Sequence, residues 1–348
     1  MHSSMPTSAD QPASIRRAML AVLGVAMLVC TACATPQAKG VPSLPFGPLF
    51  IGGWGLTTSD LVHSASEVGV NYALLYGPPP EASSPQGQAL LQANIRVISA
   101  EVSDHVSQYE CSRTATVAPK PAGSPAESYC SSDVEYSKSQ LRDDVEAIAR
   151  RDRTNPLVAG YWILDDTPDW DYGSLKPVLN ELKPLIPVDR PTICGFSAGL
   201  GPDGTDSWNP GRAENFSATA CDVVAPYVYA DSRNETDLPL SGVDWAMTGL
   251  LPKIKASLSD NGWDQSRQPL LGVAQAFGGR RAKNGAITDA PSPSDMAAQA
   301  RGFCSMGASG VAWFAWSITT NYPSAQTPAN NSALRDGVRE GAKACLRT

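Results

Sequence analysis

Eight short apolar runs follow one another along the chain, and this alternation with longer amphipathic stretches constrains the fold more than any other feature. Each run is rich in β-branched and aromatic residues and is apolar along nearly its whole length, as expected for strands covered on both faces. Strands that alternate with helical stretches predict a parallel sheet with crossover helices. The runs are Leu49–Gly52, Tyr72–Tyr76, Arg96–Ala100, Val158–Leu164, Thr192–Phe196, Val223–Tyr229, Leu270–Ala276 and Val311–Trp316.

Helical segments fill the gaps between the runs. Residues 137–151 carry apolar side chains at three- and four-residue spacing, which indicates a helix with one buried face. Thr58 or Ser59 is the expected N-cap of an earlier helix, and Ser294 that of a helix over 295–306. No Gly-x-Gly-x-x-Gly motif follows the first strand. We therefore expect a single closed (β/α)8 barrel rather than an open dinucleotide-binding sheet.

Two segments are longer than the minimal repeat requires. Residues 102–133 are rich in Ser, Ala and Pro and follow the third strand, and residues 199–220 follow the fifth. We expect both to be long loops at the carboxyl ends of the strands. Barrels of this type place their active sites on that face.

The first 33 residues have the pattern of an export signal. Arg16 and Arg17 precede the uncharged apolar run Ala18–Val29, which is too short to span a bilayer. The residues before Cys33 are small, as in a lipoprotein signal whose cysteine carries the lipid. Cleavage by an ordinary signal peptidase at the same place is the alternative. Either way, the sequence predicts an exported protein, either secreted or held at the cell envelope.

The remaining chain divides into a short linker, residues 34–45, and a barrel domain, residues 46–348. The full chain has a net charge of −7, and the part after the signal has −8, because residues 1–33 contain Asp10, Arg16 and Arg17. This acidic charge without a basic patch makes nucleic acid and anionic membrane surfaces poor partners. No later segment approaches the roughly 20 apolar residues of a membrane span. A lipid at Cys33 is therefore the one expected membrane attachment.

Six cysteines follow the signal region, an even number that suits an oxidising compartment. Buried free thiols are the alternative. No Cys-x-x-Cys is present after the signal, and the two later histidines, His63 and His105, are far apart in sequence, so we expect no metal site. The barrel order suggests local pairings, because they link neighbouring strands, neighbouring helices and the two ends of one loop. These are Cys194–Cys221, Cys304–Cys345 and Cys111–Cys130.

The strongest local signal for chemistry is the segment GYWILDDTP at 160–168, an apolar strand that ends in two carboxylates. The carboxyl end of a barrel strand points into the active-site mouth. Adjacent strand residues face opposite sides, so we expect one of Asp165 and Asp166 to face the site. The alternative is structural, because Asp166 and Thr167 before Pro168 also resemble a helix start.

This segment resembles the fourth strand of bacterial (β/α)-barrel glycoside hydrolases, which reads Gly-Tyr-Tyr/Trp-x-x-Asp-Glu-Pro. The segments 271–279 and 294–316 are similar to the seventh strand and to the seventh helix and eighth strand of the same proteins. The resemblance covers most of residues 46–345 at the level of architecture. It implies hydrolysis of glycosidic bonds in a carbohydrate substrate, without a cofactor.

The resemblance also implies roles for individual residues. Asp166 stands at the acid/base position, with Asp165 beside it. The chain departs from the family pattern twice, because the acid is Asp rather than Glu and because Gln275 replaces a nucleophilic Glu. Glycoside hydrolysis normally needs two carboxylates, so a second must come from another strand end. Glu101 and Asp231 are the candidates, either as the base of an inverting enzyme.

Aromatic side chains at strand ends are expected to stack on sugar rings, and polar ones to bind hydroxyls. Aromatics within strands, such as Tyr227 and Trp313, are expected to fill the core. A barrel that binds glycan at the cell surface without cleaving it is the alternative function, and the missing Glu on strand seven supports it. The expected substrate-binding residues are Trp54, Tyr76, Tyr229, Gln275, Phe277 and Trp316.

Overall fold

The computed structural model describes residues 49–117, 135–165, 174–197, 208–230, 242–279, 290–317 and 326–346. All eight expected strands are present, and each pairs in parallel with its neighbours in sequence. The last strand pairs with the first, from Phe50 opposite Gly310 to Gly53 opposite Trp313, and closes the barrel. The strands are β1 Phe50–Trp54, β2 Tyr72–Leu75, β3 Arg96–Ser99, β4 Val158–Leu164, β5 Thr192–Ser197, β6 Val223–Val228, β7 Leu270–Gln275 and β8 Ala308–Phe314.

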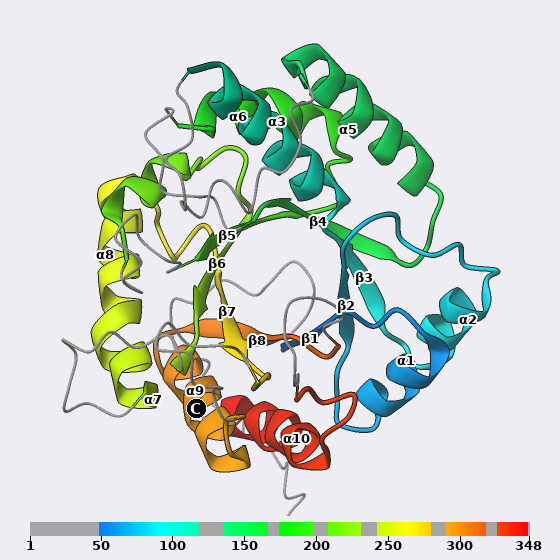
Figure 1. Cartoon of the computed structure of the whole chain (residues 1–348), viewed down its shortest axis with the longest axis vertical. Helices are drawn as coiled ribbons and strands as arrows, with labels where there is room; N and C mark the ends of the chain where they lie inside the picture. The colour runs from blue at the N-terminus through cyan, green and yellow to red at the C-terminus, as the bar shows by residue number, and fades with distance from the viewer. Residues whose placement is uncertain are drawn as a thin grey trace, which may run out of the picture. The chain divides into compact units, whose positions relative to one another are not determined.

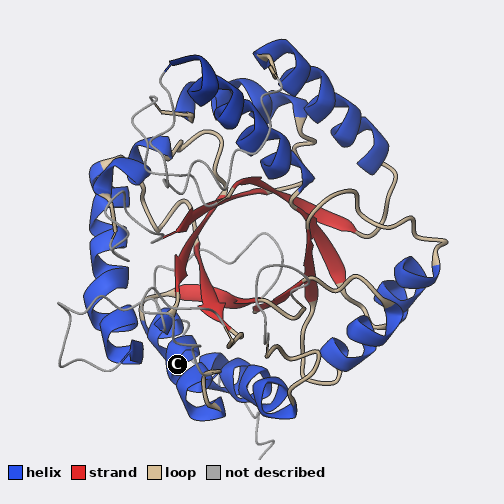
Figure 2. Cartoon of the chain, viewed as in Figure 1, coloured by secondary structure: helices blue, strands red, loops and turns tan. Residues whose placement is uncertain are grey.

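Helices surround the barrel as an outer layer (Figures 1 and 2). The chain is therefore a (β/α)8 barrel, as the alternation of runs predicted. Within the described residues, no helix is long and apolar enough to cross a membrane. The helices are α1 Ser59–Ser66, α2 Pro85–Gln92, α3 Glu101–Val117, α5 Lys138–Asp152, α6 Lys176–Leu182, α7 Gly242–Asp244, α8 Leu251–Asp260, α9 Pro293–Ser305 and α10 Ser332–Leu346, with short 3-10 or π turns η1 Lys183–Leu185, η2 Pro210–Asn215 and η5 Trp245–Leu250.

Side-chain caps explain where several helices begin. The Thr58 hydroxyl accepts a hydrogen bond from the Leu61 N–H at 3.3 Å, and Ser137 forms a capping box with Gln140 at the start of α5. The cap of α9 is Ser292, not Ser294 as we expected. Ser292 Oγ accepts from the Asp295 N–H at 3.2 Å, and proline occupies the first helical position.

The segment after β3 differs from the expected loop. Helix α3 occupies residues 101–117, and residues 118–134 lie outside the described part. The polar composition of this segment did not indicate a helix. Tertiary packing stabilises the helix, because Val102 and Val106 are buried against the outer core. The second expected loop contains η2 within its described residues, 208–220.

Two apolar clusters form the core, one inside the barrel and one between the strands and the helices. The inner cluster is rich in aromatic rings and includes Phe50, Trp54, Trp162 and Tyr227. Since a barrel of eight strands has just enough room for its inward side chains, large rings require small neighbours. The consequence of one such small neighbour, Gly195, is described with the site below.

Two of the three expected disulfides are present. Cys194 on β5 bonds Cys221 just before β6, with a Cα–Cα distance of 5.5 Å. Cys304 on α9 bonds Cys345 on α10, with a Cα–Cα distance of 5.4 Å. Cys111 is also disulfide-bonded, and its expected partner Cys130 lies outside the described residues. The predicted signal, with Cys33, and the predicted linker lie outside them as well.

Candidate functional site

A carboxylate held by two tyrosines lies at the carboxyl ends of the barrel strands. Asp165 directly follows β4 and is 9% exposed. Its Oδ2 accepts a hydrogen bond from the Tyr76 hydroxyl at 3.0 Å, and its Oδ1 accepts one from the Tyr227 hydroxyl. Tyr76 follows β2 and Tyr227 belongs to β6. Three strands that are not adjacent thus converge on one carboxyl group.

The reach of Tyr227 depends on a glycine in the strand between β4 and β6. In β5, Gly195 faces the barrel interior, and a Cβ placed there would lie 2.7 Å from Tyr227 Cε2 and 2.8 Å from Trp162 Nε1. Leu164 is paired with Cys194, so Asp165 lies level with Gly195. Because Gly195 has no side chain, the Tyr227 ring packs over the inner face of β5 at this level. Its hydroxyl can therefore donate to Asp165 on the far side.

Tyr227 is a proton donor to this carboxylate and not an ionised group. Burial raises the pKa of the Tyr227 phenol well above its ordinary value, and the adjacent Asp165 carboxylate raises it further. A phenol that keeps its proton donates to an anionic acceptor, and such charge-assisted hydrogen bonds favour the ionised carboxylate. The geometry therefore suits a carboxylate that carries negative charge during a reaction or in binding.

Aromatic rings form a continuous surface around Asp165. The Trp54 ring lies 5.6 Å from Tyr76, 4.8 Å from Trp162 and 5.9 Å from Tyr227 between centroids. The surface continues from Tyr227 through Tyr229, Phe277 and Phe314, whose neighbouring centroids are 5.4–6.1 Å apart. Tyr76 is 50% exposed, and Tyr229 and Phe314 are half-buried, whereas Trp54 and Phe277 are each 1% exposed, so only part of this cluster is accessible.

Four of the expected substrate-binding aromatics therefore lie in this cluster: Tyr76 and Tyr229 are accessible at the mouth, and Trp54 and Phe277 are buried against them. Trp316 does not lie there. It is fully buried in the outer core, and its ring carbon Cε3 is 3.5 Å from the position that a Cβ on Gly53 would occupy. The same position on Gly53 would also contact Val70 and Leu56, which belong to the outer core. Trp316 therefore lies outside the barrel wall.

Gln275, at the end of β7, is buried and hydrogen-bonded within the protein. Its Nε2 donates to the Phe277 carbonyl at 2.9 Å, and its backbone N–H donates to Gln299 Oε1 on α9 at 3.2 Å. Both bonds fix the turn that carries Phe277. Gln275 thus positions an aromatic residue of the mouth, and its expected contact with sugar hydroxyls stays a prediction.

Of the two candidates for the second carboxylate, only Glu101 lies within the described residues. Glu101 forms a bidentate ion pair with Arg151 of α5, with Nη1–Oε1 and Nη2–Oε2 distances of 3.1 and 2.6 Å. The Glu101 hydrogen bonds raise the pKa of Arg151 above its ordinary value. This pair joins α3 to α5 in the outer layer and engages both Glu101 carboxylate oxygens. Asp166 and Asp231 lie outside the described residues.

Sequence reasoning missed the part that Tyr227 plays, because its position in the middle of the sixth run indicated core filling. Strand alternation places it inside the barrel, but no sequence signal indicates that its ring crosses a neighbouring strand at a glycine. Arg212 was also missed. It lies in η2, a segment that we expected to be loop, and it is 4% exposed.

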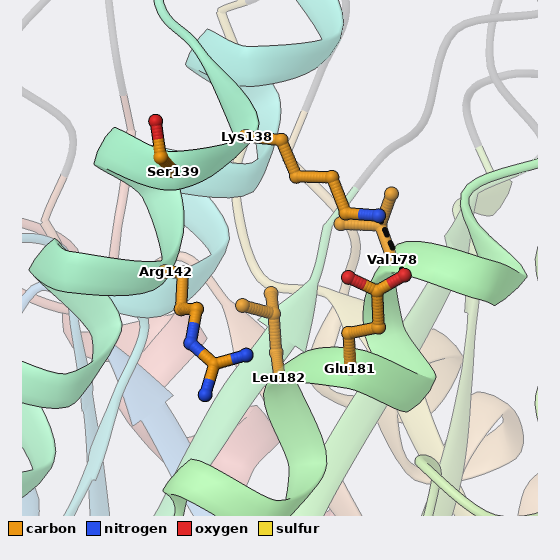
Figure 3. Close-up of a pocket in the computed structure, with 6 residues that line it drawn as sticks. All are labelled: Lys138, Ser139, Arg142, Val178, Glu181 and Leu182. Carbon is orange, nitrogen blue, oxygen red and sulfur yellow. Dashed lines mark hydrogen bonds and ion pairs between the residues drawn. The ribbon is translucent and has the colours of Figure 1, made fainter.

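A surface cavity of about 250 Å³ lies between α5 and α6, in the outer layer (Figure 3). Lys138 of α5 and Glu181 of α6 form an ion pair of 2.5 Å across it. The cavity is separate from the mouth, because both helices pack outside the barrel (Figure 1). Among the described residues, no group of three or more His, Cys, Asp or Glu side chains is placed to hold a metal ion.

Comparison with solved structures finds matches at low sequence identity. A family 18 chitinase from Pseudoalteromonas aurantia is 12% identical, with a TM-score of 0.44, over 85% of this chain and 99% of that one. A putative α-L-fucosidase from Bacteroides thetaiotaomicron is 10% identical, with a TM-score of 0.49, over 88% and 99%. An endoglucanase from Clostridum cellulovorans is 10% identical, with a TM-score of 0.46, over 83% and 94%.

No family model matches the sequence. No curated protein sequence matches it either. The structural neighbours are glycoside hydrolases by name, but identities of 10–12% and TM-scores below 0.5 carry no conclusion about this chain. A functional conclusion therefore depends on the residues of the mouth.

Proposed function

We propose that this protein is an exported glycoside hydrolase that acts on an oligo- or polysaccharide by carboxylate acid/base chemistry. The observation that carries the proposal is Asp165, a carboxylate at the carboxyl end of β4 that accepts hydrogen bonds from Tyr76 and Tyr227. It lies in a surface of aromatic rings, and such rings stack on the CH faces of sugars. A charged group beside stacking rings suits the oxocarbenium-like transition state of glycoside hydrolysis.

The proposed roles follow from this arrangement. Asp165 is the ionised partner, since two phenol donors favour its charged form, and it stabilises positive charge at the reacting carbon. Asp166, next in sequence, is the proposed general acid. Because Glu101 is paired with Arg151, we propose Asp231, which follows β6, as the second carboxylate. Tyr76 and Tyr229 are the proposed sugar-binding rings, and Trp54 and Phe277 are buried against them and support their positions.

Export is part of the proposal. The disulfides Cys194–Cys221 and Cys304–Cys345 suit a protein that folds outside the reducing cytosol. The signal over residues 1–33 and the lipid on Cys33 remain proposals from the sequence. Mass spectrometry of the protein purified from an envelope fraction tests both, because a lipidated Cys33 becomes the modified N-terminal residue.

One observation favours a second function: Gln275 is an amide, hydrogen-bonded within the protein, at a position where an acid is expected. It replaces an acid at the end of β7, and its amide is engaged with the Phe277 carbonyl. A mouth that retains stacking rings but has lost one acid would bind glycan without cleaving it. This alternative shares the aromatic surface with the hydrolase and differs from it only in chemistry.

Reducing-sugar release distinguishes the two functions. We would incubate wild type, Asp165→Asn and Asp166→Asn with bacterial, plant and fungal polysaccharides, and measure binding to the same panel by affinity electrophoresis. The hydrolase proposal expects release by wild type, a loss of at least about 100-fold in both variants, and retained binding. Binding by all three proteins without release from any glycan would establish the binding module instead.

A further inference from the structure

Both peptide groups that flank Tyr76 are hydrogen-bonded to the junction of β3 and α3. The Leu75 carbonyl, in the peptide group before Tyr76, accepts from the Ala100 N–H at 2.9 Å. The Gly77 N–H, in the peptide group after it, donates to Asp104 Oδ2 at 3.1 Å. Because the backbone of one residue has only two soft dihedral angles, which relate its two flanking peptide planes, these bonds together fix the backbone of Tyr76.

The junction that makes these two bonds is itself firmly placed. β3 ends at Ser99 and α3 begins at Glu101, so the helix follows the strand without a loop. The Ala100 carbonyl accepts from the Asp104 N–H at 3.1 Å and from the Ser103 hydroxyl at 2.7 Å. Ser103 is 1% exposed, so the first turn of α3 is packed against the rest of the barrel. The Asp104 carboxylate therefore meets the end of β2 from a fixed turn.

Gly77 is the point of greatest backbone freedom in this arrangement. Its φ of +72° is left-handed, as suits a glycine where the chain turns after β2. A Cβ placed on it would meet no atom within 4 Å, so no neighbour confines the turn on that side. The hydrogen bond to Asp104 is therefore what holds the Gly77 N–H in one direction.

The Tyr76 ring depends on its backbone more than the other donor to Asp165 does. Tyr76 is 50% exposed, whereas Tyr227 is 5% exposed and packs against Gly195. Since β3 lies between β2 and β4, the Tyr76 hydroxyl spans one strand to donate to Asp165 at 3.0 Å. Backbone angles decide which rotamers a side chain can adopt, so a half-exposed ring keeps this contact only while its backbone stays in place.

We propose that Asp104 is a positioning residue for the candidate active site: by accepting the Gly77 N–H, it holds Tyr76 in the orientation that donates to Asp165. Its catalytic meaning rests on the proposed function, but its test does not. A hydrogen bond to a carboxylate favours the ionised form. Loss of the acceptor at residue 104 should therefore weaken one donated bond and raise the titration midpoint of Asp165.

Two substitutions of Asp104 separate the hydrogen bond from the charge. Asp104→Asn removes the charge but retains an amide oxygen that can accept from the Gly77 N–H, whereas Asp104→Ala removes both. The loss of charge acts on Asp165 equally in the two variants, so it cancels when they are compared. Residue 104 titrates in neither of them.

The measurement is a titration of Asp165 that needs no substrate. Protein labelled with 13C at aspartate side-chain carboxyls is titrated by NMR, and Asp165→Asn identifies the signal. We expect the Asp165 midpoint to be higher in Asp104→Ala than in Asp104→Asn by about half a pH unit. Equal midpoints in the two variants would overturn the proposal.

The difference must also depend on the Tyr76 hydroxyl. In a Tyr76→Phe background no hydroxyl remains to be positioned, so Asp104→Ala and Asp104→Asn should have the same Asp165 midpoint. Such a cycle isolates the coupling between the two residues. A difference that persists in the Phe background would show that Asp104 acts on Asp165 by another route, and would contradict the proposal.

Loss of structure would give a different pattern. Asp104 is exposed, so neither variant leaves a cavity, and alanine favours a helix more than asparagine does. Fraying of α3 would therefore be greater in Asp104→Asn, and a higher midpoint in that variant would overturn the proposal. Asp143→Ala and Asp143→Asn, at an exposed residue of α5, are the matched controls and should have equal Asp165 midpoints.

Sugar release separates this proposal from the proposed function. If the protein is a hydrolase, we expect kcat/KM of Asp104→Ala to be about threefold below that of Asp104→Asn. The expected midpoints without any sugar release by wild type would support the role of Asp104 and remove the hydrolase function. Sugar release by wild type with equal midpoints in the two variants would retain the hydrolase and overturn the role of Asp104.

Discussion

The Tyr227 hydroxyl donates a hydrogen bond to Asp165 although the two residues belong to β6 and to the end of β4, with β5 between them. The contact exists because the intervening strand has a glycine at the crossing point. It makes the position of the candidate catalytic carboxylate depend on three consecutive strands. The predictions below test this dependence and the stability of the barrel that supports it.

Gly195→Ala should displace Tyr227 and destabilise the barrel. The added Cβ would lie 2.7 Å from Tyr227 Cε2, closer than van der Waals contact allows, inside a packed barrel. Overpacking of this kind costs about 1–3 kcal/mol, measured as the free energy of unfolding in urea. Gly249→Ala is the control, since its Cβ would meet only Trp245 Cδ1 at 3.6 Å. Equal stability of Gly195→Ala and wild type would show that Tyr227 does not depend on the gap.

Tyr76→Phe should reduce activity without reducing stability. The Tyr76 ring is half exposed, so the loss of its hydroxyl should change the free energy of unfolding by less than about 0.5 kcal/mol. It removes one of the two donors to Asp165, for which we expect a fall in kcat of at least about tenfold in sugar release. Tyr109→Phe, on outer helix α3, is the matched control and should retain full activity.

Asp152 should make the stability of the protein depend on pH. Burial raises the pKa of this carboxyl, which is 1% exposed at the end of α5, and Arg151 lowers it only in part. The folded state then binds the proton more tightly than the unfolded state. Stability should therefore fall as pH rises from the ordinary aspartate pKa, near 3.8, through the raised folded value, and stay level above it.

Asp152→Asn removes this titration while keeping an acceptor for Arg151. Urea unfolding between about pH 3.5 and 7 should give a flatter stability curve for the variant than for wild type. Asp143→Asn, an exposed residue of the same helix, is the control and should leave the slope in place. The idea fails if wild type and Asp152→Asn have parallel curves.

The disulfide between α9 and α10 should contribute substantially to stability. It closes a loop of 41 residues, for which chain entropy gives an upper estimate of about 4 kcal/mol. Cys304→Ser with Cys345→Ser should lower the free energy of unfolding by about 2–4 kcal/mol under oxidising conditions. The Cys304–Cys345 contribution should disappear when both proteins are fully reduced, so a difference that persists in reductant would indicate a packing effect.

Sequence reasoning predicted the barrel because strands buried on both faces are apolar along their whole length. All eight runs overlap observed strands, from Phe50–Trp54 to Ala308–Phe314. The runs could not show where polar segments become helical, and α3 was predicted as loop because its helical conformation depends on contacts with distant residues. The cap of α9 was displaced by two residues for a local reason, the proline after Ser292.

The candidate site was predicted less completely. The strand position of Asp165 placed a carboxylate at the mouth, and strand ends identified Trp54, Tyr76 and Tyr229. Side-chain contacts between strands were not predictable, because they depend on how far neighbouring strands are shifted along one another. Tyr227 contacts Asp165 because the register of β5 with β4 and with β6 places both residues beside Gly195. The ion pair between Glu101 and Arg151 likewise depends on how α3 packs against α5.

Asp165 receives its hydrogen bonds from residues that lie 89 and 62 positions away in the chain. No fragment that ends before β6 contains all three partners, so the site is assembled only in a chain that has folded through its sixth repeat. A glycan that requires the assembled site has affinity for the native barrel and none for partly folded forms. By mass action, such a ligand would slow proteolysis and shift thermal unfolding upward, with the logarithm of its concentration once that exceeds the Kd. Protection by a candidate glycan would thus report a match to this mouth even for a chain that cleaves nothing.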